Sequence, residues 1–303
     1  MSSTPTVSVI ISTRNRCKML GNAIQSVLNQ TFKDFELIIV DGASTDNTKE
    51  VVNSFIDERI IYIKQKENIS NIDSLNRGLA VARGKYIALQ DDDDEWYPEK
   101  LEKQIKLFVS GPSELGLVYC WEEIFDYKNK RIISRTCQNL RGNVFLDLLA
   151  YPGYGGGSLM VFKKSVVDNI PFIKDTRMPS DYLWCLCVAK QYQFDYVPEV
   201  LSRTNVNHLY GRVSNLACNE LSYKDAIELS EKILTTFAED FAMYPKKKKY
   251  HYRSIINNAI KSKEAKKFFD YYFKSFNMMK WDYRYYGYLW RFIFNYIGII
   301  KYK

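Results

Sequence analysis

Short apolar runs alternate with amphipathic helical patterns over the first hundred residues, and this alternation limits the fold more than any other feature. The apolar runs cover residues 7–11, 35–40, 60–63 and 86–90. Between them, apolar side chains recur at the spacing of a helix that packs one face on a sheet. The order β-α-β-α-β-α-β predicts an α/β fold with a doubly wound, mostly parallel sheet and flanking helices. In such sheets, ligands bind beside the carboxyl ends of the strands.

Four consecutive aspartates, Asp91 to Asp94, directly follow the fourth apolar run. Like charges at a strand end repel one another unless a cation or a set of hydrogen-bond donors neutralises them. Carboxylate oxygens suit hard divalent ions such as Mg²⁺ and Mn²⁺, which often bridge a protein to phosphates. We therefore expect a metal–diphosphate site, with Asp41 at the end of the second run facing the same crevice. A solvated acidic turn before a helix is the alternative.

Two common nucleotide-binding signatures are absent from the sequence. No G-x-G-x-x-G follows the first apolar run, which argues against an ordinary dinucleotide-binding fold, and there is no Walker-type loop. No apolar run is long enough to span a bilayer. We expect a cytoplasmic protein that lies on the inner face of the cell membrane.

A glycine-rich stretch at residues 151–158 precedes an apolar run that we expect to be a further strand. Glycine allows a ligand to approach the backbone closely. Gly156, Gly157 and Ser158 are therefore candidates for contacts with a diphosphate or an acceptor. A plain surface turn is the alternative.

Basic and aromatic residues concentrate near the end of the chain. Residues 245–303 contain 15 Lys and Arg against 3 Asp and Glu, and residues 281–300 contain nine aromatic side chains. We expect a helical, basic and aromatic C-terminal region over residues 221–303, with a helical segment at 255–273, beside a domain of residues 1–220. This composition is typical of a segment that contacts an anionic membrane surface. A helical subdomain with a solvated basic face is the alternative, and nucleic-acid binding is not expected.

Several motifs occur in the order and at the separations of a known family. Residues 7–15, 40–48 and 91–96 resemble family 2 glycosyltransferases with a GT-A fold, and residues 73–78 are similar to a stretch of bacterial surface-polysaccharide members. The resemblance covers about residues 5–210. It implies inverting, metal-dependent transfer of one sugar from a nucleotide-sugar, with a UDP-sugar expected, to an acceptor hydroxyl. The expected acceptor is a lipid-linked glycan in surface polysaccharide biosynthesis.

The resemblance also gives roles to individual side chains. Asp181 matches the base that takes the acceptor proton, although Ser180 stands where a glutamate is common, and a helix N-cap is the alternative. Asp91 and Asp93 match the outer members of a D-x-D motif, in which the second reaches the Mn²⁺ or Mg²⁺ ion. The residues that match or flank nucleotide contacts are Thr13, Arg14, Asp41, Asp73, Asn76, Arg77, Asp91 and Asp92. His208 and Arg212 are candidates for a diphosphate contact, with plain surface positions as the alternative.

Two other functions stay open at this point. A nucleotidyl- or phosphoryl-transferase could use the same aspartate–metal site, but only Arg14, Arg16 and Lys18 offer a basic cradle for a triphosphate. A non-catalytic nucleotide-binding membrane adaptor would keep the fold without depending on Asp181. The Q-x-x-R-W signature of processive relatives is absent, so we expect a single sugar addition per encounter.

Overall fold

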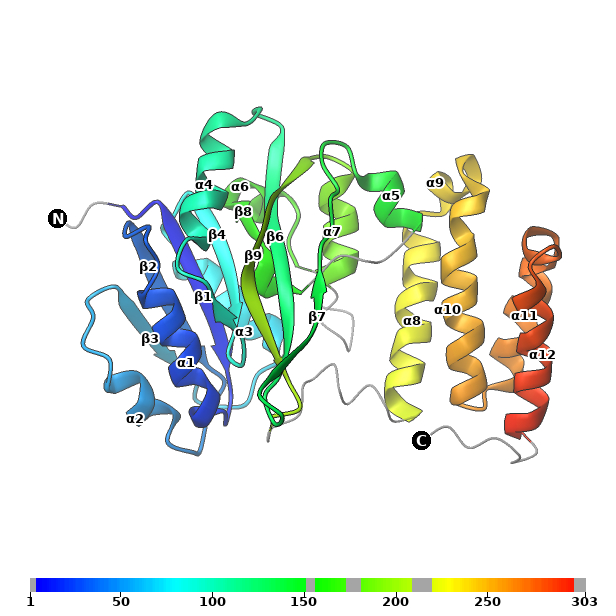
Figure 1. Cartoon of the computed structure of the whole chain (residues 1–303), viewed down its shortest axis with the longest axis horizontal. Helices are drawn as coiled ribbons and strands as arrows, with labels where there is room; N and C mark the ends of the chain where they lie inside the picture. Colours follow the sequence, from blue (N-terminus) through cyan, green and yellow to red (C-terminus); the bar gives the residue numbers. More distant parts are fainter. Residues whose placement is uncertain (1–3, 151–155, 173–180, 209–219, 297–303) are drawn as a thin grey trace. The chain divides into compact units, whose positions relative to one another are not determined.

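A computed structural model describes residues 4–150, 156–172, 181–208 and 220–296 (Figure 1). These residues separate into two compact units. The first unit contains the described residues up to 145, then 156–172 and 184–208. The second contains 146–150, 181–183 and 220–296. The boundary expected at residue 220 stays a prediction, because residues 209–219 lie outside the described ranges.

The first unit is built on one sheet, whose strand order among the described residues is β3-β2-β1-β4-β8-β6-β9-β5, with β7 paired to β6. The strands are β1 (Val7–Thr13), β2 (Phe35–Asp41), β3 (Ile60–Lys64), β4 (Tyr86–Asp91), β5 (Glu95–Trp96), β6 (Leu115–Asp126), β7 (Arg131–Thr136), β8 (Val161–Lys163) and β9 (Gln193–Val206). Strands β3, β2, β1 and β4 are parallel. Strand β8 is antiparallel to both β4 and β6. The predicted α/β sheet is confirmed.

Helices cover both faces of this sheet. Among the described residues up to 189, the helices are α1 (Cys17–Leu28), α2 (Thr48–Asn53), α3 (Asn71–Val81), α4 (Lys100–Ser110), α5 (Phe145–Ala150), α6 (Lys164–Asn169) and α7 (Asp181–Ala189), of which most of α5 and the start of α7 belong to the second unit. The chain moves outward from β1 to β3 and then returns past β2 and β1 to β4. Because parallel crossovers are right-handed, this reversal puts α3 on the opposite face from α1. Figure 1 shows α1 in front of the strands and α3 behind them.

Helix α3 packs against the sheet at Gly78. A Cβ atom at Gly78 would lie 2.6 Å from Ile10 Cγ2 and 3.4 Å from Val40 Cγ2. Those two side chains belong to β1 and β2, which are buried on both faces of the sheet. The missing side chain therefore sets how closely α3 and its polar outer residues approach the strands.

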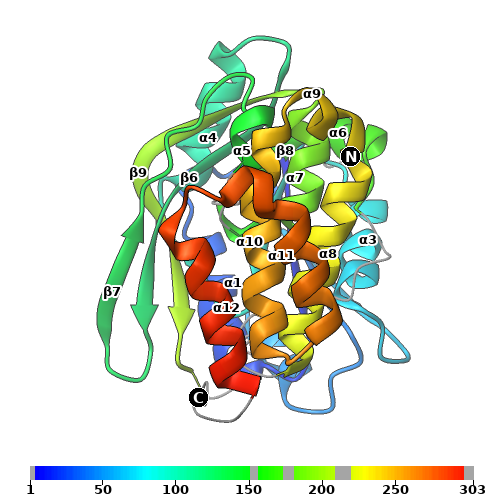
Figure 2. The ribbon, with the colours of Figure 1, turned by 90° about the vertical axis from the view of Figure 1, so that its right-hand side faces the viewer.

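The second unit is helical and has a core of its own. Its helices are α8 (Glu220–Thr236), α9 (Ala238–Met243), α10 (Lys248–Lys261), α11 (Ala265–Met279) and α12 (Tyr283–Tyr296), with parts of α5 and α7. In Figure 2, α10 lies beside α8 and α11. Ile255, Phe268 and Tyr285 are among the buried residues of its core. No helix in the described ranges combines the length and apolar character needed to cross a membrane.

The helical segment expected at residues 255–273 is divided in the structure. Helix α10 ends at Lys261 and α11 begins at Ala265. Between them, Lys263 has a positive φ of 57°. The Glu264 N–H donates to the Ala259 carbonyl at 2.9 Å, which satisfies a free carbonyl at the end of α10. The periodic pattern continues across this break, so the pattern alone does not reveal it.

Candidate active site

The carboxyl ends of three neighbouring strands bring Thr13, Asp41 and Asp91 to one edge of the sheet. In the pairing of β1 with β2, Thr13 lies opposite Asp41. In the pairing of β1 with β4, Ser12 lies opposite Asp91. Asp41 and Asp91 therefore lie on either side of the end of β1.

The acidic run forms a tight turn after β4. Asp91 is exposed, whereas Asp92, Asp93 and Asp94 are buried. One carboxylate oxygen from each of Asp91, Asp93 and Asp94 lies within 4.8 Å of the others. Carboxylates this close repel one another, so the turn needs donors or cations around it.

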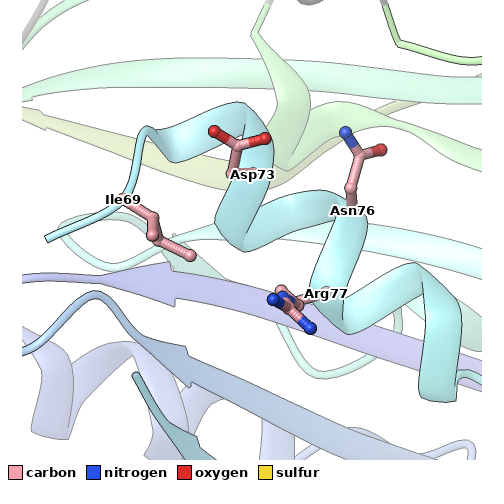
Figure 3. Close-up of a pocket in the computed structure, with 4 residues that line it drawn as sticks. All are labelled: Ile69, Asp73, Asn76 and Arg77. Carbon is pink, nitrogen blue, oxygen red and sulfur yellow. The ribbon is translucent and has the colours of Figure 1, made fainter. Parts of the chain in front are cut away.

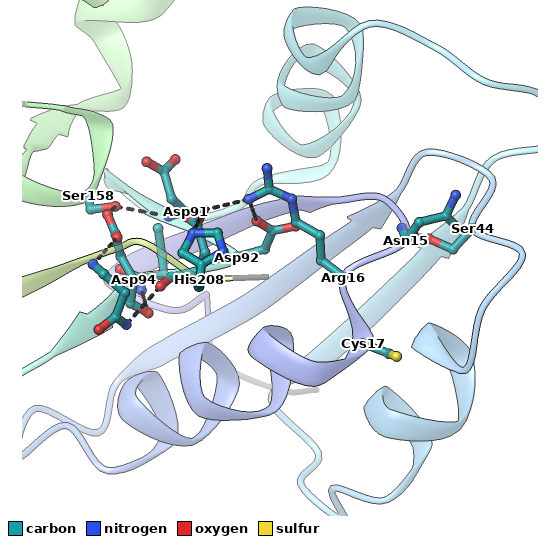
Figure 4. Close-up of polar contacts among 12 residues, drawn as sticks. Asn15, Arg16, Cys17, Ser44, Asp91, Asp92, Asp94, Ser158 and His208 are labelled. Atoms are coloured by element: carbon teal, nitrogen blue, oxygen red, sulfur yellow. Dashed lines mark hydrogen bonds and ion pairs between the residues drawn. The ribbon is translucent and has the colours of Figure 1, made fainter. Parts of the chain in front are cut away.

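Asp94 receives donors from two distant segments (Figure 4). The Ser158 hydroxyl lies 3.0 Å from Asp94 Oδ2, and the Asn205 N–H donates to Asp94 Oδ1 at 3.1 Å. Ser158 Oγ also accepts the Asp91 N–H at 3.0 Å. The Asn205 side-chain amide donates to the Asp93 carbonyl at 2.8 Å. These contacts fasten the turn to β9 and to the short 3₁₀ helix Gly157–Leu159.

Asp92 and Asp93 are neutralised by a cation from the loop after β1. Arg16 Nη1 lies 3.1 Å from Asp92 Oδ1 and 2.5 Å from Asp93 Oδ2. His208 Nε2 lies 3.1 Å from the same Asp93 oxygen. Burial raises the pKa of the Asp92 carboxyl to about 7, although the Arg16 charge acts in the opposite direction. Figure 4 shows Arg16 and His208 converging on the acidic turn.

The donor set of this turn fits a hard divalent cation. Three carboxylate oxygens from Asp91, Asp93 and Asp94 gather without any sulfur ligand, and Mg²⁺ and Mn²⁺ favour oxygen ligands of this kind. Both oxygens of Asp94 already accept hydrogen bonds from the protein. Asp93, which the resemblance gives as the metal ligand, presents its Oδ2 to Arg16 and His208.

Asp41 is fully buried and both of its oxygens have partners within the protein. The Ser44 N–H donates to Oδ1 at 2.7 Å, and the Tyr62 hydroxyl donates to Oδ2 at 2.5 Å. Burial and this hydrogen bond raise the pKa of the Tyr62 hydroxyl. Asp41 thus organises the loop after β2. Its contact with the nucleotide stays a prediction.

The loops after β1 and β2 are joined to each other by Asn15, which has a positive φ of 53°. Its N–H donates to Ser44 Oγ at 2.9 Å, and its Oδ1 accepts the Thr45 N–H at 2.8 Å. Asparagine tolerates this backbone conformation better than most residues. The two loops that carry predicted nucleotide contacts therefore form one connected rim.

The three predicted nucleotide contacts on α3 lie together. Asp73, Asn76 and Arg77 line an open cavity of about 270 Å³ with Ile69 (Figure 3). Asp73 also closes the start of α3, where Ser70 Oγ donates to its Oδ2 at 2.8 Å and accepts its N–H at 3.0 Å. The cavity brings these side chains together, while contact with a nucleotide stays a prediction.

The remaining predicted residues differ in exposure and in the unit to which they belong. Thr13 is buried and Arg14 is exposed. Gly156 is exposed, whereas Gly157 and Ser158 are buried. Asp181 is half-buried, begins α7 and belongs to the second unit. Arg212 lies outside the described residues.

Arg16 and Asn205 contact the acidic turn, and neither contact was predicted. The sequence names Arg16 only as part of a possible basic cradle for a triphosphate. Its position directly after β1, at the same edge of the sheet as the acidic turn, is a sequence signal for its contact with Asp92 and Asp93. Asn205 carries no such signal, since it is 111 residues away from Asp94 in sequence. The contact of Asn205 with the turn becomes visible only when β9 is placed in the sheet.

Solved structures with the same arrangement of strands and helices define the fold of this protein as GT-A. Staphylococcus aureus TarS (residues 1–349) in complex with UDP-GlcNAc aligns with a TM-score of 0.57 and 15% identity, over 95% of this chain and 81% of that chain. The mannosyltransferase PcManGT from Pyrobaculum calidifontis, in complex with GDP-Man and Mn²⁺, aligns with a TM-score of 0.59 and 16% identity, over 99% and 89%. These likenesses confirm the predicted fold.

The model of the family "Glycosyl transferase family 2" matches residues 8–166, and the chain belongs to this family. The uncharacterized glycosyltransferase MJ1057 of Methanocaldococcus jannaschii is 31% identical over 214 residues, which cover 67% of this chain and 71% of the relative. Escherichia coli WfaP, a UDP-Glc:alpha-D-GlcNAc-diphosphoundecaprenol beta-1,3-glucosyltransferase, is 39% identical over 99 residues, or 33% and 39% of the two chains. The protein is thus a glycosyltransferase, as the resemblance implied.

Proposed function

We propose that this enzyme transfers one sugar from a UDP-sugar to a hydroxyl of a lipid-linked glycan, with inversion and with Mn²⁺ or Mg²⁺ as cofactor. The observation that carries the proposal is the gathering of carboxylate oxygens from Asp91, Asp93 and Asp94 at the end of β4. UDP-GlcNAc in the TarS complex and the UDP-Glc specificity in the name of WfaP support a uridine donor. The lipid diphosphate in the name of WfaP supports the acceptor class, and with it a place in surface polysaccharide biosynthesis.

Each part of the turn has a separate task in this proposal. A divalent ion held by Asp91 and Asp93 would supply the positive charge that stabilises a departing nucleoside diphosphate. Asp94, Ser158 and Asn205 fix the turn so that the carboxylates keep their spacing. No acid is needed to protonate a diphosphate leaving group, which fits a site made of carboxylates and cations.

Inversion requires a base on the face of the sugar opposite the leaving group. We assign this role to Asp181, at the first position of α7. Its carboxylate would take the proton of the acceptor hydroxyl as the new glycosidic bond forms. Asp181→Asn should then abolish transfer while the affinity for the nucleotide is retained.

The test is release of nucleoside diphosphate from a panel of UDP- and GDP-sugars, with a lipid-diphosphate-linked glycan as acceptor. We expect release from a UDP-sugar with Mn²⁺ or Mg²⁺, and none with a chelator. GDP-sugars are included because PcManGT binds GDP-Man. Transfer that continues unchanged in the chelator would rule out the metal, and retention at the anomeric carbon would rule out the role of Asp181.

The second unit provides a surface that suits the proposed acceptor. The exposed apolar side chains of α11, α12 and the turn between them are Phe269, Phe273, Phe276, Trp281, Tyr286, Trp290, Ile293 and Tyr296. Lys266, Lys274, Arg284 and Arg291 are exposed on the same helices. We propose that this aromatic–basic surface contacts the anionic inner face of the cell membrane, where a lipid-linked acceptor lies.

A further inference from the structure

Arg16 pairs with Asp93, one of the three carboxylates of the candidate metal site. Its Nη1 contacts both Asp92 and Asp93, at 3.1 Å and 2.5 Å. The Asp93 oxygen that it contacts also lies 3.1 Å from His208 Nε2. The side chains of Arg16, Asp92 and Asp93 are largely buried, with exposed fractions of 16%, 9% and 6%. The Arg16 guanidinium thus places a positive charge of the protein itself beside the carboxylates of Asp92 and Asp93.

A second cation at Asp93 would meet this guanidinium at short range. Two positive charges a few ångströms apart in a partly buried site repel strongly unless an anion lies between them. A diphosphate is such an anion, because its oxygens can bind a divalent ion and accept hydrogen bonds from a guanidinium. The geometry of Arg16 and Asp93 therefore disfavours the metal alone and favours the metal together with a diphosphate.

We propose that Arg16 is a positioning residue that makes metal binding depend on the nucleoside diphosphate. Without the nucleotide, Arg16 pairs with Asp92 and Asp93. With the nucleotide, the guanidinium turns to the diphosphate, and Asp93 is released to the metal ion. This inference rests on the proposed metal-dependent function and adds a residue that couples the two ligands.

Coupling of this kind is reciprocal and can be measured without sugar transfer. If UDP tightens the binding of Mn²⁺, then Mn²⁺ must tighten the binding of UDP by the same factor. We therefore suggest titrating Mn²⁺ by electron paramagnetic resonance, with and without saturating UDP, on the full chain. GDP is titrated in parallel because the base of the donor is itself a proposal.

For the wild-type protein, we expect UDP to tighten Mn²⁺ binding by about tenfold or more. Arg16→Gln should bind Mn²⁺ more tightly than the wild type when UDP is absent, because the competing cation is gone. In this variant, UDP should tighten Mn²⁺ binding by less than about threefold. Arg16→Lys keeps the charge but loses the planar fork, so its coupling should lie between the two.

Lys18→Gln is the matched control, since Lys18 is exposed on the first turn of α1 and its loss removes the same charge. Its coupling should equal that of the wild type. The double variant Arg16→Gln/Asp92→Asn is also measured, because it removes one buried positive charge and one buried negative charge. It takes the place of Arg16→Gln if that single variant unfolds at a much lower temperature than the wild type. The pair should show the same loss of coupling.

Two results would overturn the role of Arg16. One is a weaker affinity for Mn²⁺ without UDP in Arg16→Gln, which would make Arg16 an organiser of the metal site. The other is full coupling in that variant. A wild-type protein that binds Mn²⁺ neither with UDP nor with GDP would instead overturn the proposed function itself, and the inference with it.

Discussion

Neighbouring aspartates of the acidic turn differ in their partners. Asp93 contacts a cation, whereas Asp94 accepts hydrogen bonds from Ser158 and Asn205. We expect Asp93→Asn to lower sugar transfer by about 100-fold or more, because charge that stabilises the leaving group is lost with the metal. Asp94→Asn should lower the free energy of unfolding by ~1–3 kcal/mol, because an amide cannot accept both donors.

The two variants are matched, since each replaces one carboxylate by an amide of the same shape. Urea unfolding and the release of nucleoside diphosphate are measured on both. Asp93→Asn should unfold close to the wild-type midpoint, because Arg16 keeps Asp92 as a partner. An equal loss of stability in both variants would contradict the separate roles of the two residues.

A buried histidine should make the second unit sensitive to acid. His251 Nε2 lies 3.1 Å from the Leu149 carbonyl, and burial lowers the pKa of its imidazole to about 4. An unfolded histidine has a pKa of about 6.5, so the unfolded state binds more protons between these two values. The stability of the second unit should therefore fall as the pH drops through this window, by up to ~3 kcal/mol.

The contribution of His251 to the acid sensitivity is measured by comparison with His251→Gln, whose amide can still donate to the Leu149 carbonyl. Hydrogen exchange of α10 at pH 7 and at pH 4.5 reports on the second unit. The wild type should lose more protection than the variant on acidification. The same loss in both proteins would show that His251 does not cause the acid sensitivity.

At the scale of elements, Gly78 limits how closely α3 packs on the sheet. Gly78→Ala would put a methyl group 2.6 Å from Ile10 Cγ2. We expect this substitution to destabilise the protein by ~1–3 kcal/mol, since a packed core resists an added methyl group. It should also weaken UDP binding, because α3 carries the cavity lined by Asp73, Asn76 and Arg77.

Gly21→Ala on α1 is the control, because its methyl group would meet its nearest neighbour, Val51 Cγ1, at 3.7 Å. Alanine favours a helix over glycine, so this variant should be neutral or more stable by up to ~1 kcal/mol. Thermal unfolding and UDP titration are compared for the two variants. If Gly78→Ala matched Gly21→Ala in both measurements, the close packing of α3 would not limit the site.

Elements with a local sequence signal were predicted well, and contacts between distant elements were not. The strands that end at Asp41 and Asp91 follow from apolar runs bounded by polar turns. The partners of the acidic turn depend on β9, which joins the sheet beside β6 after long intervening segments. No periodicity near Asn205 indicates that it will donate to Asp94. The break at Lys263 was missed because its neighbours keep the helical spacing.

At the scale of the whole molecule, basic charge and exposed aromatic area are concentrated in the second unit. Trp281 and Trp290 have exposed fractions of 92% and 61%. Burial of such side chains in the headgroup region contributes about 1 kcal/mol or more each. Replacing both by serine should therefore reduce binding to phosphatidylglycerol vesicles by about tenfold or more. Cosedimentation measures this binding.

Val109→Ser in the first unit is the control, because Val109 has an exposed fraction of 76% on α4. It should leave vesicle binding unchanged. Binding of the wild type should also weaken in high salt, since exposed charges are then screened. Equal binding to vesicles of neutral phosphatidylcholine would contradict an anionic membrane as the partner.

The attachment of the acidic turn to β9 has a consequence for the protein during its synthesis. All four aspartates have left the ribosome long before Asn205 is translated, yet Asn205 supplies donors that hold the turn. A nascent chain that stops short of β9 therefore lacks the anchored carboxylates. Such a chain would not bind the donor substrate in competition with the finished enzyme. The enzyme would become active only after β9 has been synthesised.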